Sequence, residues 1–407
     1  MDIGKIGYLI PEFPGQTHTW IWREITHMRE WGQTIQIFST RRPTNRDRAR
    51  HAWSEEAVAG TSYLWPRPIL ATLGAVVWAA IRHPVGFLRC IWLVLTLPVI
   101  RRPRLFSVGS LLPPACILAR ESERIGIVHL HSHSCASGAI LAMMLKRITR
   151  IPYSLTLNAN IEWWGGAMRE KFSDATFVIS ITQRLLDQIH REFPDLAAGQ
   201  ALLGRIGVDT RKWLPGRHDD DSRIVTVGRM HPSKGHDILL CAVKEVTRAR
   251  PDVTLCMIGD GPQRAELEVL ADKLGLRNRV IFTGSASEDQ IIEELRRADI
   301  FALASHAEPL GVVFMEAMSM AVATIGTAAG GVNEIITDGS DGLLVPPGDV
   351  AAMASAIRTL LDNTSRRRAL GAAGRNTIVR NFDSRIGAAT LYQCIHGVTP
   401  ESSEAIR

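Results

Sequence analysis

The feature that most constrains the fold of this chain is the repeated alternation of short apolar runs with segments of helical character. In the first half the runs are KIGYLI (5–10), TIQIFST (34–40), GIVHLHS (126–132), YSLTLN (153–158) and TFVIS (176–180). In the second half they are RIVTVG (223–228), TLCMIG (254–259), VIFTG (280–284), IFALA (300–304), VATIG (322–326) and GLLVP (342–346). Strands that alternate with helices form parallel sheets covered by helices. We therefore predict an α/β protein of two doubly wound, Rossmann-like domains that face a crevice.

The length of 407 residues exceeds what one hydrophobic core usually supports, which also favours two domains. The segment 204–215 leads from a last short strand into a polar run. We place the boundary there, with an N-terminal domain at 1–205 and a C-terminal domain at 206–380.

Composition indicates an ordinary globular protein, with 46% hydrophobic and 22% charged residues. The six cysteines show no C-x-x-C pair and no spacing typical of a metal site, so we expect reduced thiols. The N-terminal MDIGKIGYLI enters a strand directly and lacks the pattern of a secretion signal. These features predict a cytoplasmic protein.

Positive charge is concentrated in a basic, apolar insertion at about 41–104. This segment carries 11 arginines against the acidic residues Asp47, Glu55 and Glu56. A basic surface attracts anions. Nucleic acid is one such anion, but the segment is too apolar for that role, so we predict no nucleic-acid binding.

Two uncharged apolar runs, 68–81 and 90–100, lie among these arginines, and each is too short to cross a bilayer as a helix. Apolar helices with arginines and tryptophans such as Trp65, Trp78 and Trp92 are typical of segments that bind an anionic membrane surface. We expect a peripheral protein at the inner face of the plasma membrane. A helical insertion that packs on its own domain is the alternative.

Residues 308–349, EPLGVVFMEAMSMAVATIGTAAGGVNEIITDGSDGLLVPPGD, carry the strongest indication of function. IFALA predicts a buried strand and SHAEPLG a turn, so a helix should begin near Gly311. The amides of Gly311 and Val312 at its start would bind an anion such as a diphosphate. Glu308, before the helix, and Glu316, about a turn and a half inside it, can accept hydrogen bonds from sugar and ribose hydroxyls.

A second loop carries positive charge. RMHPSKGHD follows the first strand of the C-terminal domain, and its Arg229 and Lys234 can neutralise a diphosphate beside a helix N-terminus. No metal is then required. The turns GDGP (259–262) and GSA (284–286) permit close approach of a ligand, but the chain has no G-x-G-x-x-G pattern there, which argues against a dehydrogenase.

With these motifs the chain resembles the retaining glycosyltransferases of family 4, which have the GT-B fold. The resemblance rests on the E-x7-E pair of Glu308 and Glu316, on GGVNE at 330–334 and on the G-R-x-x-x-x-K-G pattern at 228–235. It covers nearly the whole chain and is densest at 223–349. FPGQTHTWIWREI and STRRP are similar to segments of exopolysaccharide-biosynthesis members.

The resemblance implies roles for these residues. Glu308 would contact hydroxyls of the donor sugar and Glu316 the ribose, while Arg229 and Lys234 would bind the donor phosphates and stabilise the departing nucleotide. The base would dock near Gly259, and Gly15 would let the backbone approach the phosphates from the other domain. The last helix, at about 381–396, would return to the first domain.

The implied reaction moves a hexose-type sugar from a nucleotide diphosphate donor, of UDP or GDP type, to an acceptor hydroxyl. It retains the anomeric configuration and needs no metal or other cofactor. The expected acceptor is a saccharide or a polyprenyl-linked saccharide in exopolysaccharide or cell-surface glycan synthesis.

Three histidines, His129, His131 and His133, end a predicted strand at two-residue spacing, a pattern that also suits zinc. No acidic or cysteine ligand is near in sequence, so we predict no metal. In the family a similar segment lines the acceptor site. His133, followed by His131, is therefore the candidate for contacting the transferred sugar or the acceptor hydroxyl, with locally satisfied strand-end histidines as the alternative.

The main departure from the family is Asn158, where many relatives have a histidine. An amide cannot act as a base at neutral pH. This leaves other hypotheses open: a catalytically impaired nucleotide-sugar-binding partner of a glycosyltransferase, or another GT-B enzyme such as an epimerase or a phosphorylase.

Overall fold

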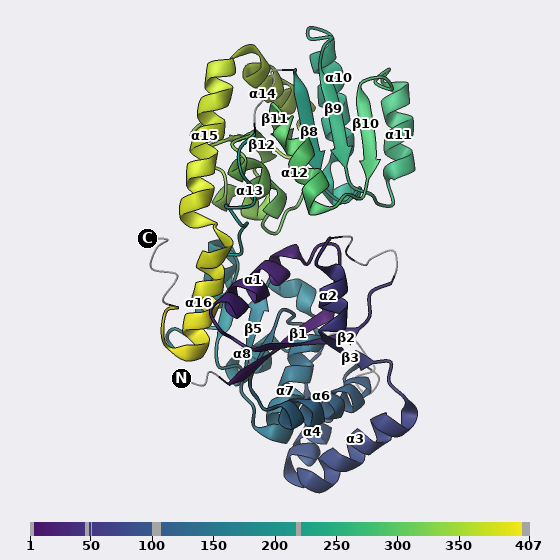
Figure 1. Ribbon diagram of the computed structural model, residues 1–407, viewed down its shortest axis with the longest axis vertical. Coiled ribbons are helices and arrows are strands. Elements are labelled where there is room, and N and C mark those ends of the chain that lie inside the picture. Colours follow the sequence, from purple (N-terminus) through teal and green to yellow (C-terminus); the bar gives the residue numbers. More distant parts are fainter. Residues whose placement is uncertain (1–3, 45–48, 50, 100–106, 217–220, 401–407) are drawn as a thin grey trace. The chain divides into compact units, whose positions relative to one another are not determined.

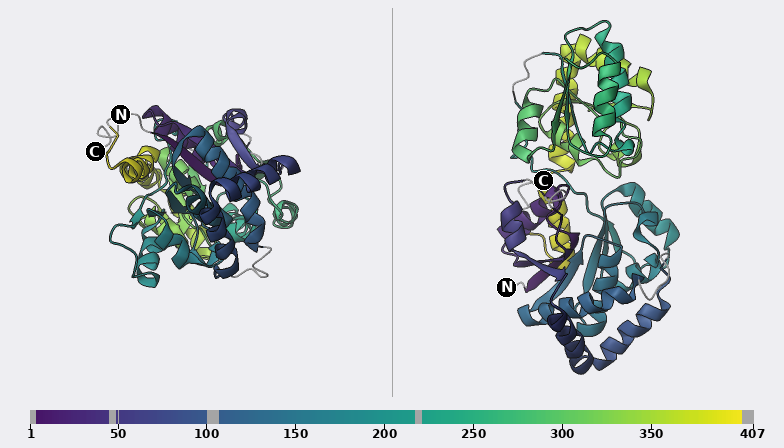
Figure 2. Two further views of the ribbon diagram at one scale, coloured as in Figure 1. Left: turned by 90° about the horizontal axis from the view of Figure 1, so that it is seen from below. Right: turned by 90° about the vertical axis from the view of Figure 1, so that its right-hand side faces the viewer.

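The computed structural model describes residues 4–44, 49, 51–99, 107–216 and 221–400. The chain forms two compact units (Figures 1 and 2). Of the described residues, those up to Arg205 and those at 387–400 belong to the N-terminal unit, and Ile206–Ile386 belong to the C-terminal unit.

The N-terminal unit is built on a parallel sheet in the order β3-β2-β1-β4-β5-β6-β7. The strands are β1 (Lys5–Glu12), β2 (Ile35–Arg41), β3 (Thr61–Trp65), β4 (Ile127–Ser132), β5 (Tyr153–Leu157), β6 (Val178–Ser180) and β7 (Ala201–Leu203). The helices are α1 (Thr19–Glu30), α2 (Ser54–Ala59), α3 (Ile69–Arg82), α4 (Pro84–Thr96), α6 (Leu112–Ile125), α7 (Ser137–Thr149), α8 (Met168–Asp174) and α9 (Gln183–Glu192), with 3-10 turns η1 (Gly109–Leu111) and η2 (Ile161–Trp164).

Successive side chains of each strand point to opposite faces of this sheet, and both faces are buried, as is usual for a parallel sheet. Leu9 and Leu130 belong to a core that includes α6 and α7, whereas Tyr8 and Ile10 belong to a separate core that includes α1. Both faces of the sheet are therefore covered by helices.

The C-terminal unit repeats this plan with the strand order β10-β9-β8-β11-β12-β13. Its strands are β8 (Arg223–Val227), β9 (Thr254–Ile258), β10 (Val280–Gly284), β11 (Ile300–Ala302), β12 (Ala323–Thr327) and β13 (Leu343–Val345). Its helices are α10 (His236–Thr247), α11 (Arg264–Lys273), α12 (Glu288–Arg296), α13 (Val312–Ser319), α14 (Val350–Asp362) and α15 (Thr364–Asn381), with 3-10 turns η3 (Pro232–Lys234) and η4 (Gly330–Glu334).

The last helix, α16 (Ser384–His396), continues from the C-terminal into the N-terminal unit, where Leu391 and Tyr392 join the core beside α1. It begins at Ser384 instead of near 381. The helix is interrupted between α15 and α16. There Val208 donates its amide to the carbonyl of Phe382, and the Asp383 side chain accepts the amide of Arg385 at 2.9 Å.

The predicted α/β fold of two doubly wound domains is confirmed. In each sheet the order in which strands are added reverses at one point. This point lies at β1, between β2 and β4, in the first sheet and at β8, between β9 and β11, in the second. Open α/β sheets bind ligands at the carboxyl ends of the two strands where this reversal occurs. The loops after β1 and β4, and those after β8 and β11, are therefore the places to look for a site.

The apolar runs of the insertion form the consecutive helices α3 and α4. Of the arginines predicted to face a membrane, Arg46, Arg48, Arg50 and the cluster at 101–104 lie outside the described residues.

Candidate functional site

In the C-terminal unit, the loops after β8 and β11 are joined by an ion pair between two predicted site residues. Lys234 Nζ lies 2.5 Å from Glu308 Oε2. The lysine side chain is 21% exposed and the glutamate 7%. Ser305 donates its hydroxyl to the same carboxylate oxygen at 3.3 Å. The carboxylate is thus held by two donors, and the lysine ammonium still reaches solvent.

Backbone contacts hold this pair in place. His306 donates its amide to Ser233 O at 2.8 Å, which ties the β11 loop to the β8 loop. Gly331, in the GGVNE segment, donates its amide to Glu308 O at 2.9 Å. Its neighbour Gly330 has a φ of 59°, and a Cβ there would collide with the Glu308 carbonyl. The GGVNE motif therefore fixes the position of Glu308.

The helix predicted to begin near Gly311 is α13, whose first residue is Val312 and whose N-terminal cap is Gly311. The φ of 99° at Gly311 favours glycine, and a Cβ would lie 2.6 Å from Phe314 Cδ2. The first amides of α13 have no intrahelical acceptor and can bind an anion. Glu316 lies on this helix and is buried.

The remaining predicted donor residues differ in exposure. Arg229 is exposed beside β8, and its side chain makes no ion pair with another described residue. It is available to a charged ligand. Gly259, after β9, donates its amide to Gly284 O at 2.9 Å and packs against the backbone of Gly228. Its close contacts are therefore with the protein backbone.

In the N-terminal unit, Gly15 follows β1 but its amide already has an acceptor. The Gly15 amide donates to His18 Nδ1 at 3.1 Å, and the His18 amide donates to Gly15 O at 3.0 Å. Burial, with a smaller effect of nearby His133, lowers the pKa of His18 to about 4, so its ring stays neutral at neutral pH. Gly15 and His18 thus form a closed turn.

The histidines of β4 form a buried network with hydroxyls of β5. His129 Nε2 lies 2.7 Å from Ser154 Oγ. His131 lies between Ser154 Oγ, at 2.8 Å from Nδ1, and Thr156 Oγ1, at 2.9 Å from Nε2. Burial and the neighbouring histidines hold the pKa of His131 well below its usual range. Both rings are therefore neutral. They match the alternative interpretation of the sequence, in which the strand-end histidines form local hydrogen bonds.

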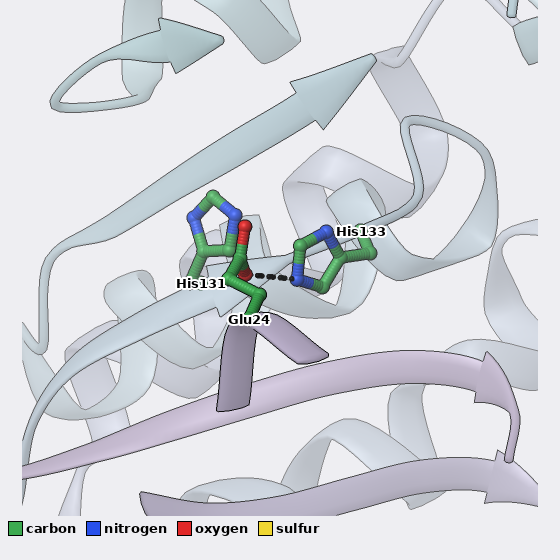
Figure 3. A group of neighbouring side chains, drawn as sticks. All are labelled: Glu24, His131 and His133. Atoms are coloured by element: carbon green, nitrogen blue, oxygen red, sulfur yellow. Dashed lines mark ion pairs between the residues drawn. The ribbon is translucent and has the colours of Figure 1, made fainter. Parts of the chain in front are cut away.

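His133 follows β4 and lies against a carboxylate from α1 (Figure 3). Its Nε2 is 3.0 Å from Glu24 Oε1. The two atoms are not aligned as a hydrogen bond, so they form an ion pair when the ring is protonated. The rings of Trp20 and Tyr8 lie 5.0 and 5.4 Å from the His133 ring, which is fully buried. Glu24 is 12% exposed.

Glu24, His131 and His133 also place potential metal-ligating atoms within 4.8 Å of one another, and no other such group occurs in the described part of the chain. The acidic ligand that appeared to be missing from the local sequence comes from α1. However, each nitrogen of His131 already faces a hydroxyl, and a metal would have to displace one of them. The contacts fit a hydrogen-bonded network better than a metal centre.

Sequence reasoning missed Glu24, Trp20 and Tyr8 as neighbours of His133. The available signal was the spacing of Trp20 and Glu24, which are four residues apart and share one face of a helix. Asn158, half-buried after β5, lies at the same edge of the sheet. Beyond it is a polar hollow of about 410 Å³, lined by Asn160, Glu162, Arg184, Asp187, Gln188 and Arg191.

Comparison with known proteins identifies the class of the C-terminal unit. Residues 209–377 match the family described as glycosyl transferases group 1. This segment contains the Lys234–Glu308 pair and α13. The C-terminal unit therefore matches a glycosyl transferases group 1 domain over the segment whose motifs predict a glycosyltransferase.

Individual relatives carry glycosyltransferase names. The chain is 30% identical over 252 residues to the GDP-mannose-dependent alpha-(1-6)-phosphatidylinositol monomannoside mannosyltransferase of Mycolicibacterium smegmatis, covering 57% of this chain and 65% of that protein. It is 29% identical over 291 residues to alpha-D-kanosaminyltransferase of Streptomyces kanamyceticus, covering 64% and 75%. The aligned region thus spans just under two thirds of the mannosyltransferase.

Solved structures match over nearly the full length. Anabaena HepE in complex with UDP has a TM-score of 0.74 at 17% identity and covers 97% of this chain and 100% of its own. Sucrose-phosphate synthase of Thermosynechococcus elongatus has a TM-score of 0.70 at 21% identity, covering 96% and 98%. At these identities the likeness concerns the fold, which is the GT-B arrangement of two Rossmann-like units.

Proposed function

We propose that this protein is a glycosyltransferase that moves a sugar from a nucleotide diphosphate donor to an acceptor hydroxyl, with retention of configuration and without a metal. The observation that carries the proposal is the Lys234–Glu308 ion pair. It brings a cation suited to phosphate and a carboxylate suited to sugar hydroxyls to the strand reversal of a glycosyl transferases group 1 domain.

The donor would be bound as follows. Lys234 and the exposed Arg229 neutralise the diphosphate together with the free amides at the start of α13. When a phosphate approaches, the Lys234 ammonium pairs with it, and its contact with Glu308 weakens. The Glu308 carboxylate can then accept hydrogen bonds from the donor sugar. Glu316 accepts hydrogen bonds from the ribose.

In the proposed reaction the bond from the anomeric carbon to the diphosphate oxygen breaks, and a bond from that carbon to the acceptor oxygen forms on the same face. The acceptor proton passes to an oxygen of the departing phosphate, so no side chain need be the base. This accommodates Asn158, whose amide cannot take up a proton. Arg229, Lys234 and α13 stabilise the charge on the leaving nucleoside diphosphate as it develops.

On the N-terminal unit, we assign His133 and Glu24 to the acceptor side. His133 is fully buried, so the more exposed Glu24 would meet a hydroxyl first and His133 would orient its carboxylate. Relatives support both expected donor types. HepE was solved with UDP, whereas the mycobacterial enzyme is named for GDP-mannose and a phosphatidylinositol-linked acceptor. A saccharide or polyprenyl-linked acceptor in cell-surface glycan synthesis fits this set.

The test is to incubate the protein with UDP- and GDP-sugars and a lipid extract or saccharide library, and to measure release of the nucleoside diphosphate with and without acceptor. Acceptor-dependent release supports transfer, and an NMR spectrum of the product showing the donor's anomeric configuration supports retention. Conversion of the sugar nucleotide without any acceptor, or an inverted product, would contradict the proposal.

A further inference from the structure

Eleven of the eighteen large apolar side chains that are exposed on the described part of the molecule fall between Trp65 and Leu95. Six of them, on α3 and α4, are 61–84% exposed: Ile69, Leu70, Ile81, Val85, Leu88 and Trp92. Soluble proteins rarely expose a contiguous apolar surface of this kind unless it binds something. We call the outward side of α3 and α4 the apolar face.

The same helices are apolar on their inner side. Ala75 and Ala79 of α3 and Cys90 and Leu93 of α4 belong to the core of the N-terminal unit. α3 packs on α6 and α4 on α7, as Figure 1 shows. At Gly86 the backbone of α4 comes so close to Arg147 that an added Cβ would collide with its carbonyl. Helices that are apolar all round are usually covered on every side, and here the outer side is open.

Helices α3 and α4 carry charge of one sign, and Glu121 and Glu123 of the neighbouring α6 already pair with Arg67 and His83. No acidic residue occurs between Glu56 and Glu121, and that stretch contains seven arginines and no lysine. Arg82 and Arg89 lie on α3 and α4 themselves, are exposed, and have no ion-pair partner among the described residues. Arg67 is different because it pairs with Glu121 at 3.2 Å. An apolar surface set among unpaired arginines is complementary to an apolar, anionic partner.

A second copy of the chain does not meet this requirement. A two-fold contact through the apolar face would place each patch against itself. Arg82 and Arg89 would then face like charges, and neither α3 nor α4 has a carboxylate to compensate them. An anionic bilayer supplies both the hydrocarbon and the negative charge.

We propose that the apolar face of α3 and α4 inserts into one leaflet of an anionic membrane, with Arg82 and Arg89 at the lipid phosphates. In the described residues no single helix is long and apolar enough to span a bilayer. α3 and α4 together reach the required length and composition but are bent by 113° at their junction. Because their inner sides are held by α6 and α7, the pair lies in the surface of the bilayer.

The position of these helices ties the membrane to the acceptor side, a step that rests on the proposed function. α3 follows the carboxyl end of β3, and Val99, after α4, forms a β-bridge to Gly166 in the segment after β5. Both ends of the helix pair are thus attached at the edge of the sheet that bears His133 and Asn158. An acceptor with a lipid tail in the same leaflet would present its sugar near this edge.

The test is flotation of the full-length protein with vesicles of phosphatidylcholine containing roughly 30% phosphatidylglycerol, compared with phosphatidylcholine alone. No donor or acceptor is needed, so the result is independent of the proposed reaction. We expect binding to the anionic vesicles, and a blue shift of tryptophan fluorescence as Trp92 leaves water.

The variant Leu70→Gln/Leu88→Gln/Trp92→Gln should weaken vesicle binding by about tenfold or more, since it removes apolar area that enters the lipid. The control Leu214→Gln/Val269→Gln/Ile281→Gln changes three apolar residues of the C-terminal unit that are 47–53% exposed, and it should bind like the wild type. All six side chains are outside the core, and circular dichroism checks the fold.

Two outcomes would overturn the proposal. One is vesicle binding that the α3/α4 variant leaves unchanged. The other is no binding to the anionic vesicles; if sedimentation then shows a dimer that the α3/α4 variant dissociates, a second copy is the occupant of the apolar face.

Discussion

At the residue scale, Lys234 and Glu308 show what the sequence could and could not predict. Both were assigned to a donor site from their motifs, yet they are separated by 74 positions and their contact was not foreseen. The contact forms because β8 pairs with β11 in the sheet. This pairing follows from the strand order and could not be inferred from the spacing of the two residues in the sequence. The same holds for Glu24, which reaches His133 from a helix far away in the sequence.

Removing one partner of the Lys234–Glu308 pair should cost stability, because the buried carboxylate of Glu308 would lose its main charged donor. We expect Lys234→Met to destabilise the C-terminal unit by about 1–3 kcal/mol, and to lower the midpoint of its thermal unfolding by roughly 2–12 °C. Calorimetry measures both. In the double variant Lys234→Met/Glu308→Gln most of the loss should be recovered; penalties that simply add would show that the pair is not coupled.

Glu24 and His133 should affect turnover but not donor binding, because both belong to the N-terminal unit. Glu24→Gln and His133→Ala are each expected to reduce kcat by about 100-fold, because the acceptor hydroxyl would no longer be held in its reactive position. Equilibrium titration with the nucleotide should give an unchanged Kd. A normal kcat in both variants would remove these residues from the acceptor side.

The three-residue group in Figure 3 provides a direct test of metal independence. Because both nitrogens of His131 face hydroxyls, we expect added Zn²⁺ to leave the thermal midpoint of the protein unchanged, and a chelator to leave turnover unchanged. A Zn²⁺-dependent rise in the midpoint that is absent in His133→Ala would instead identify a metal site.

At the scale of elements, the long apolar runs were predicted well and the short or irregular ones less so. β1, β2, β8 and β9 correspond to short apolar runs whose length and flanking turn residues favour a strand. β3 was missed because TSYLW is short and follows a basic stretch, so neither its periodicity nor its flanking residues separate it from a loop. The apolar runs at 68–81 and 90–100 predicted helices on a membrane, but their composition alone did not tell which side would stay exposed.

The GGVNE segment has a geometric role, and a comparison of Gly330 within it with Gly339 outside it provides a matched test. Gly330 and Gly339 both have positive φ, of 59° and 73°, but only Gly330 has a neighbour that a Cβ would strike, the carbonyl of Glu308. Gly339→Ala should cost about 1–2 kcal/mol of stability from backbone strain alone and leave donor affinity unchanged.

Gly330→Ala should cost more stability and also displace Glu308, so donor affinity should fall by about tenfold or more. Calorimetry and nucleotide titration on the two variants measure these effects side by side. Equal donor affinity in both variants would show that the GGVNE segment does not set the position of Glu308.

At the scale of the whole molecule, buried histidines make stability depend on pH. Burial lowers the pKa of His18, His129 and His236 to about 4 each, compared with about 6.5 in an unfolded chain. Between these values the unfolded state binds protons that the folded state does not, so stability falls as pH decreases from about 6.5 to 4. Above pH 7 these histidines should cause no further change of stability with pH.

The expected loss is on the order of 3 kcal/mol for each fully buried histidine across this window. Thermal unfolding followed at a series of pH values measures it. His236→Leu should make the stability of the C-terminal unit depend less steeply on pH. A wild-type midpoint that does not fall towards pH 4 would contradict the assignment of neutral buried rings.

The central claim is that the C-terminal unit binds a nucleotide diphosphate sugar through Lys234, Glu308 and Glu316. The most direct measurement is a thermal-shift screen of the protein against UDP, GDP, ADP and their sugar conjugates, with Lys234→Met and Glu316→Ala in parallel. We predict that one nucleotide series stabilises the wild type, by about 2.7 kcal/mol at a ligand concentration of 100 times Kd, and that both variants lose this effect. Stabilisation by none of the nucleotides, or an equal shift in the variants, would contradict it.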